Sequence, residues 1–197
     1  MKVHRPRSLW FVLSLLCLAA TVGCGGANWQ VMRQASPNPF RGAATFTLLP
    51  LDVTQMTIDG EPAASWLAHN PTEASGVPGD IQEAASHFPT TALEHAHGAF
   101  VPQGGTYGVR ARIVAWQRGS YNAWRPTQTR VSVDAQIVDA QGQVLDEIRL
   151  ERFVSHPLFR PTPVQGLETA LEEIGEDVGN YVNHRRTAML GHPHHAG

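Results

Sequence analysis

The sequence predicts an α+β fold: a small, mainly antiparallel sheet covered on one face by two helices, the second a carboxy-terminal amphipathic helix. Three observations support this prediction. Apolar and polar residues alternate over 107–115 and 130–137, which is typical of half-buried strands. Residues 139–142 have the composition of a hairpin turn, with Gly142 at the position that favours positive φ. An apolar stripe with helical spacing follows over 162–186.

The elements upstream of this sheet are less regular. A first strand is expected over 44–53, where Pro50 restricts one end to a sheet edge or a bulge. A short helix is expected over 61–69, followed by a loop over 71–79.

A second helix is expected to open at Asp80, with Glu83 as its capping-box partner. Pro89 is expected to end or kink this helix after two turns. Helical structure then resumes over 91–97 and is closed by Gly98.

The last two elements carry clear local signals. The strand over 143–154 shifts its apolar spacing at 145–148, which predicts a β-bulge. The final helix has Thr162 as its N-cap, Pro163 at its first position and Gln165 completing a capping box. Glycines at 175 and 179 predict close packing of this helix on the sheet. The expected apolar stripe comprises Val164, Leu167, Leu171, Ile174, Val178 and Tyr181.

The first 24 residues have the layout of a secretory signal that ends at a cysteine. Basic residues occupy the start of the chain, an apolar run extends over 9–22, and Cys24 follows the small residue Gly23. The apolar run has 14 residues, whereas a membrane-spanning helix needs about 20. The segment is therefore expected to be removed rather than kept as an anchor.

This segment resembles the lipobox of bacterial lipoproteins, in which the cysteine is acylated and becomes the first residue of the mature chain. The family usually has Leu three residues before the cysteine, and Thr21 stands there instead. Gly25 follows Cys24 where an Asp favours retention at the inner membrane, so the resemblance implies a lipid anchor in the outer membrane, facing the periplasm. Exposure at the cell exterior, a soluble form cleaved near Ala20 and an uncleaved anchor are the alternatives.

Composition excludes several classes of function. After removal of residues 1–23 the chain keeps 12 basic and 17 acidic side chains, a net charge of −5, and no lysine. Such a chain is not expected to bind nucleic acid or to dock electrostatically on anionic lipid. Cys17 is lost with the signal and Cys24 would be acylated, so the folded part has no thiol for a disulfide, a zinc ligand or a nucleophile.

The predicted domain organisation is a signal peptide over 1–23, a lipidated tether over 24–43, one α+β domain over 44–186 and a disordered tail over 187–197. The tether prediction rests on flexible glycines and on the turn residues at 36–39. Three apolar residues could fasten part of the tether to the domain: Trp29, Val31 and Phe40.

Candidate chemistry is sparse. His87, His95 and His97 are weak metal candidates, because they would have to converge to bind zinc. No nucleophile elbow, zinc-protease motif or phosphate-binding loop is present. The sequence therefore predicts a protein that is not an enzyme and has no cofactor. A metal-assisted hydrolase is the enzyme alternative.

Aromatic residues gather in one hairpin region, where exposed rings would favour a partner or a lipid chain. The alternative is that they fill the core. The candidate partner surface comprises Tyr107, Trp116, Tyr121 and Trp124.

Three further segments resemble a group of small uncharacterised Gram-negative envelope lipoproteins: residues 36–40, 138–148 and 175–179. The likeness extends more distantly to auxiliary lipoproteins of ABC-type transport and to the amino-terminal domain of TolB. The resemblance implies a non-enzymatic module that binds or assembles with another envelope protein in the periplasm. Accessory function in lipid or lipopolysaccharide transport is the alternative, and it would need an apolar groove, for example between the last helix and the sheet.

Overall fold

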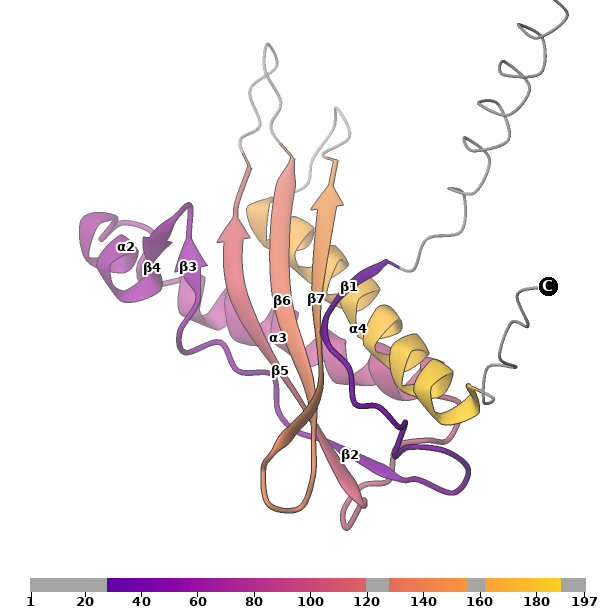
Figure 1. Cartoon of the computed structure of the whole chain (residues 1–197). Coiled ribbons are helices and arrows are strands. Elements are labelled where there is room, and N and C mark those ends of the chain that lie inside the picture. Colours follow the sequence, from indigo (N-terminus) through magenta and orange to yellow (C-terminus); the bar gives the residue numbers. More distant parts are fainter. Residues whose placement is uncertain (1–27, 120–127, 156–161, 189–197) are drawn as a thin grey trace, which may run out of the picture.

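The computed structural model describes residues 28–119, 128–155 and 162–188. In these residues seven strands form one mixed sheet with three helices, which confirms the predicted α+β class (Figure 1). The strands are β1 (Trp29–Arg33), β2 (Phe46–Leu48), β3 (Thr57–Ile58), β4 (Glu61–Pro62), β5 (Tyr107–Gln117), β6 (Thr129–Val138) and β7 (Val144–Val154). The helices are α2 (Ala63–His69), α3 (Val77–His95) and α4 (Pro163–Thr187).

The centre of the sheet is the antiparallel meander β5–β6–β7. The strand order is β1-β7-β6-β5-β3-β4, and the short strand β2 also pairs with β5. Strands β2 and β3 run parallel to β5, which makes the sheet mainly rather than wholly antiparallel. The predicted hairpin turn is present, with Gly142 at φ 80°. The predicted bulge lies at Leu145, where the register between β6 and β7 shifts.

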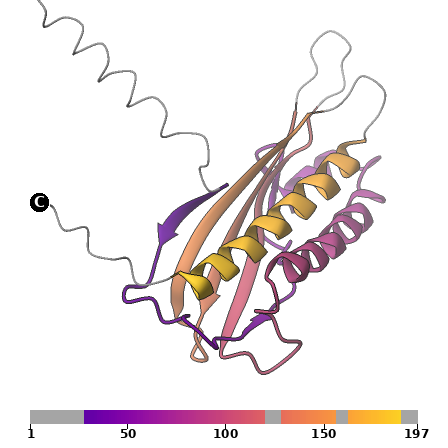
Figure 2. The same ribbon diagram turned by 90° about the vertical axis from the view of Figure 1, so that its right-hand side faces the viewer.

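Helices α3 and α4 lie on one face of the sheet, as predicted (Figures 1 and 2). Side chains from this sheet face and from the two helices form the core, and its largest fully buried members include Phe88, Ile113, Leu150 and Leu171. Among the described residues, neither α3 nor α4 covers the opposite sheet face (Figure 2), which carries charged side chains such as Arg112, Asp134 and Arg149.

Helix α4 forms as the sequence predicts. Thr162 accepts a hydrogen bond from the Gln165 amide, and the Gln165 side chain accepts one from the Thr162 amide, which completes the capping box. Its apolar stripe is buried from Leu167 through Tyr181. Among the described residues, no helix combines the length and the apolar character required to cross a bilayer.

Helix α3 differs from the prediction. It is one continuous helix that begins three residues before Asp80 and runs through Pro89. Proline removes one hydrogen-bond donor from the ladder, but α3 packs along α4 and buries Phe88 and Ala92 completely. Tertiary packing therefore compensates for the hydrogen bond that is missing at Pro89. Local sequence signals do not contain this contribution.

The strand expected over 44–53 is also shorter than predicted. Only Phe46–Leu48 is a strand, and Asp52 adds an isolated bridge to Arg112. Pro50 separates the two, as expected from its missing donor.

The tether prediction is wrong for most of its length. Residues Trp29–Arg33 form the edge strand β1, paired antiparallel with β7. Phe40 is fully buried and packs against Tyr107, with ring centroids 4.9 Å apart. Of the three side chains considered as clamps, Trp29 and Phe40 pack on the domain, whereas Val31 is 45% exposed. Cys24, the signal segment and most of the predicted tail lie outside the described residues.

Candidate functional site

A buried polar cluster fixes the amino-terminal segment to the domain. Asp146 of β7 is completely buried. Its carboxylate accepts hydrogen bonds from the Ala35 amide at 2.8 Å, the Tyr181 hydroxyl at 2.7 Å and Arg185 Nε at 2.6 Å. A buried carboxylate is tolerated only when it is paired and hydrogen-bonded. Here the partners come from the amino-terminal segment and from α4, and Asp146 itself belongs to β7, so the cluster joins the amino-terminal segment, the sheet and α4.

Arg185 extends this cluster along the amino-terminal segment. Its Nη2 donates to the Ala35 carbonyl at 3.0 Å, and its guanidinium carbon lies 5.3 Å from the centre of the Phe40 ring. The Asn38 side chain donates back to the Arg185 carbonyl at 2.7 Å. Burial, followed by the hydrogen bond to Asp146, raises the pKa of Tyr181 well above its usual range, so the hydroxyl is a donor at neutral pH.

A second set of contacts holds the very start of the described chain. The Asn28 side chain donates to Asp177 of α4 at 3.2 Å, and Asp177 also forms an ion pair with Arg152 of β7. The Trp29 ring meets Tyr181 edge-on, with centroids 5.4 Å apart. The chain is thus bound to the domain from Asn28 onward, and three residues separate it from Cys24.

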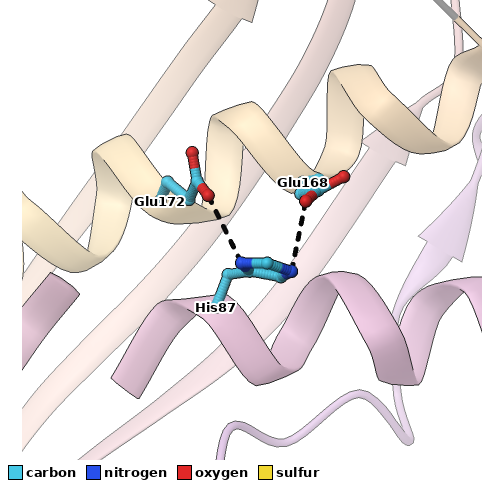
Figure 3. A group of neighbouring side chains, drawn as sticks. All are labelled: His87, Glu168 and Glu172. Atoms are coloured by element: carbon cyan, nitrogen blue, oxygen red, sulfur yellow. Dashed lines mark ion pairs between the residues drawn. The ribbon is translucent and has the colours of Figure 1, made fainter. Parts of the chain in front are cut away.

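A second candidate site lies at the surface between α3 and α4 (Figure 3). The His87 ring stands between two carboxylates that are one turn apart on α4. Its Nε2 is 3.1 Å from Glu168 Oε1, and its Nδ1 is 3.3 Å from Glu172 Oε1. One ligand atom from each residue can be chosen so that all three lie within 4.8 Å of one another.

The predicted set of three metal-binding histidines does not form. His95 lies two turns beyond His87 on α3 and faces a different carboxylate, Glu176, at 3.7 Å. His97 follows the end of α3 in a left-handed conformation, with φ 48°. Among the described residues, His87 finds its partners on α4, which no spacing in the sequence could reveal.

Two glycines allow α3 and α4 to approach this closely. An ideal Cβ added to Gly179 would lie 2.5 Å from the Ala92 carbonyl oxygen, and one added to Gly175 would lie 2.6 Å from the Phe88 carbonyl oxygen. Because the later glycine meets the later residues of α3, the two helices run in the same direction. The glycine spacing therefore serves contact between helices, and the predicted contact with the sheet is wrong.

The uncovered sheet face carries rows of charged side chains that pair across strands. In the central row, the Asp134 carboxylate accepts hydrogen bonds from Arg112 Nη2 at 3.1 Å and from Arg149 Nε at 2.8 Å. Burial alone would raise the pKa of Asp134, but the hydrogen bonds and charges of the two arginines outweigh it and lower the pKa. Ionised Asp134 therefore stabilises the fold at neutral pH, and this contribution is lost as the pH falls below its ordinary pKa of 3.8.

The predicted aromatic partner surface does not assemble. Trp116 is buried and contributes to the core. Tyr107 is half-buried against Phe40 and Phe46. The two residues stand at opposite ends of β5, about 30 Å apart along the strand. Tyr121 and Trp124 lie outside the described residues.

Comparisons with known proteins return likenesses in fold only. No protein family matches the chain, and no curated protein matches it significantly. The PelC dodecamer from Paraburkholderia phytofirmans is 12% identical over 81% of this chain and 98% of that one, with a TM-score of 0.43. A candidate lipoprotein from Caulobacter crescentus is 17% identical over 50% of this chain and 83% of that one, with a TM-score of 0.33. At TM-scores below 0.5 these likenesses do not extend to function.

Proposed function

We propose that this protein is a lipid-anchored protein of the Gram-negative cell envelope that acts by binding another envelope protein and not by catalysis. Acyl chains on Cys24 hold it to the outer membrane, and the domain faces the periplasm. The proposal rests on the signal-like segment that ends at Cys24, on Gly25 after it, and on the way the following residues join the domain.

The observation that carries the proposal is the docked amino-terminal segment. Because the chain is bound from Asn28 onward, the free length from Cys24 is four residue steps. Fully extended, four steps span about 14 Å, which is less than the diameter of the domain. A domain on so short a connection stays next to the bilayer, and this raises its effective concentration toward a partner in the same membrane.

Two ionisable clusters of the described residues are committed to structural contacts, which supports a non-enzymatic role. Asp146 and Asp134, the two buried carboxylates of the cluster and the sheet row, are occupied by arginines and other donors. Their hydrogen bonds fasten parts of the chain to one another. A general acid or base needs an atom free to meet a substrate, and these carboxylates are committed to structural contacts.

The transport alternative is not favoured. A lipid carrier of the predicted kind needs an apolar groove between the last helix and the sheet. The side chains that line this interface, including Leu167, Leu171 and Ile174 of α4, are fully buried in the core. Around these residues the space is therefore filled by the protein itself. The more distant likeness to ABC-transport auxiliary lipoproteins and to the TolB domain stays a prediction.

Anchoring is tested by fractionation of cells that express Cys24→Ala, with Cys17→Ala as the matched control, since Cys17 is the other cysteine of the chain. We expect the control to stay in carbonate-washed outer membranes and Cys24→Ala to leave them. If Cys24→Ala is not exported, a form with a signal peptide cleaved without lipidation replaces it. Undiminished membrane retention of the non-lipidated form would refute the anchor.

Partner binding is tested by photo-crosslinking in intact cells. A photoreactive residue is placed at Arg110 on the uncovered sheet face or at Glu83 on the exposed side of α3. We expect one position to give a defined adduct with another envelope protein, and the adduct to weaken in the Cys24→Ala form. Absence of any adduct from both faces would contradict the binding role.

A further inference from the structure

We propose that His87, Glu168 and Glu172 bind a divalent cation of the zinc class, which bridges α3 and α4 at the surface. The proposal does not depend on lipidation or on the proposed function. It follows from the donor atoms, their spacing, the local charge and the rigidity of the two helices.

The three donor atoms suit a cation that binds both nitrogen and oxygen ligands. One imidazole nitrogen with two carboxylates is a combination that zinc accepts, whereas magnesium and calcium prefer oxygen ligands only. The ligand atoms of a tetrahedral zinc ion with bonds of about 2.1 Å lie about 3.4 Å apart. His87 Nε2 and Glu168 Oε1 are already 3.1 Å apart.

Glu172 can complete the set by a small movement. It faces Nδ1 of the same ring, and one imidazole offers a single nitrogen to a given ion. One ligand atom from each residue can be chosen so that all three lie within 4.8 Å of one another, which exceeds the separation suited to zinc by about 1.4 Å at most. A modest movement of Glu172 therefore brings the set together on one ion. The Glu172 side chain is 45% exposed and is free to rotate, and water can occupy the fourth position.

The local charge favours a cation. Glu168 and Glu172 are like charges one helical turn apart, a pairing that destabilises a helix. Among the ion pairs of the described residues, neither carboxylate has an arginine or lysine partner, and His87 is the partner of each. A divalent ion bound between them would neutralise both carboxylates.

The scaffold is rigid enough to keep the ligands together. At Gly175 and Gly179 the backbones of α3 and α4 are in direct contact, so the two helices cannot slide past one another. Side chains on facing turns are thereby held at a fixed separation. Preorganisation of this kind is what a metal site on two different elements requires.

The test is thermal unfolding of the full chain in mild detergent, stripped with EDTA and then given ZnCl2 or MgCl2. Zinc at about 100 times its Kd is expected to raise the melting temperature by about 5 °C or more. A site equally available in the folded and the unfolded chain gives no shift. Magnesium is expected to give none.

Variants assign the shift to the site. His87→Ala and Glu172→Gln are expected to abolish the zinc-dependent rise, and Glu172→Gln serves alone if His87→Ala does not fold. His95→Ala is the matched control, because the ion-pair partner of His95 in the described part of the chain is Glu176, and it is expected to keep the rise. The proposal would be overturned if zinc did not raise the melting temperature of the wild type, or if it raised that of Glu172→Gln equally. An equal rise with magnesium would also overturn it. The three side chains would then form ion pairs and no metal site.

Discussion

Replacement of Gly179 by alanine tests the direct backbone contact between α3 and α4. The added Cβ would lie 2.5 Å from the Ala92 carbonyl oxygen and 3.0 Å from the Ala96 amide nitrogen. Both obstacles are backbone atoms of α3, so no side-chain rotation can relieve them. Because ordinary contacts begin at 3.4 Å, α3 must move away from α4 by about 0.9 Å, which loosens the packing of core residues between them.

The magnitude follows from two opposed terms. Insertion of a methyl group into a tightly packed contact costs about 1–3 kcal/mol, and loosened packing of the fully buried Phe88 places this contact at the upper end of the range. Alanine recovers about 1 kcal/mol through its higher helix propensity. We therefore expect a net loss of about 2 kcal/mol in the free energy of unfolding, or about 4–8 °C in melting temperature.

The assay is urea unfolding followed by circular dichroism, with Gly79→Ala as the matched control. Gly79 also lies inside α3, but a Cβ there would meet nothing within 4 Å. This control is expected to gain about 0.5–1 kcal/mol from propensity alone. If Gly179→Ala were as stable as Gly79→Ala, the close contact that holds α3 against α4 would be refuted.

The remaining predictions concern three polar contacts. Asp146→Ala leaves the Arg185 guanidinium buried without its carboxylate and is expected to lower the free energy of unfolding by about 3–5 kcal/mol in urea titrations; a loss below 1 kcal/mol would contradict the cluster's role. For Asp134→Asn, the stability deficit relative to the wild type is expected to be greatest at neutral pH. It should shrink as the pH falls below 3.8, because this carboxyl then binds a proton in the unfolded wild type while it stays ionised in the folded protein to a lower pH; a constant deficit from pH 7 to pH 3 would argue against this. Thr162→Ala removes the N-cap of α4 and is expected to cost about 1 kcal/mol, measured by thermal unfolding, whereas Thr162→Ser should cost little.

Local signals predicted the parts of the fold whose partners are near in sequence. Gly142 specified the hairpin turn because its φ is positive, and Thr162 specified the start of α4 because its capping partner is three residues away. The alternation in β5 and β6 marked the face that packs on the helices. Each of these features is decided within a few residues of the chain.

Contacts between residues that are far apart in the chain could not be predicted from the sequence. The turn residues around Asn38 have no period that indicates burial, yet Asp146 binds this segment from 111 residues away. His87 was predicted to bind metal together with two histidines near it in the sequence. Its partners in the structure are instead carboxylates of α4, about 80 residues later. Trp116 continues an alternating strand, but a bulge in β5 turns its side chain into the core. Charge pairs and bulges of this kind depend on how the elements pack.

The lipid anchor and the bound partner are tested together by native mass spectrometry of the intact protein, extracted from its own membranes in mild detergent. We expect a chain that begins at Cys24, carries acyl groups on that residue, lacks residues 1–23 and retains a bound envelope protein. An unmodified Cys24, or a mature chain that begins near Ala20, would contradict the lipid anchor and the short connection on which the proposed function depends.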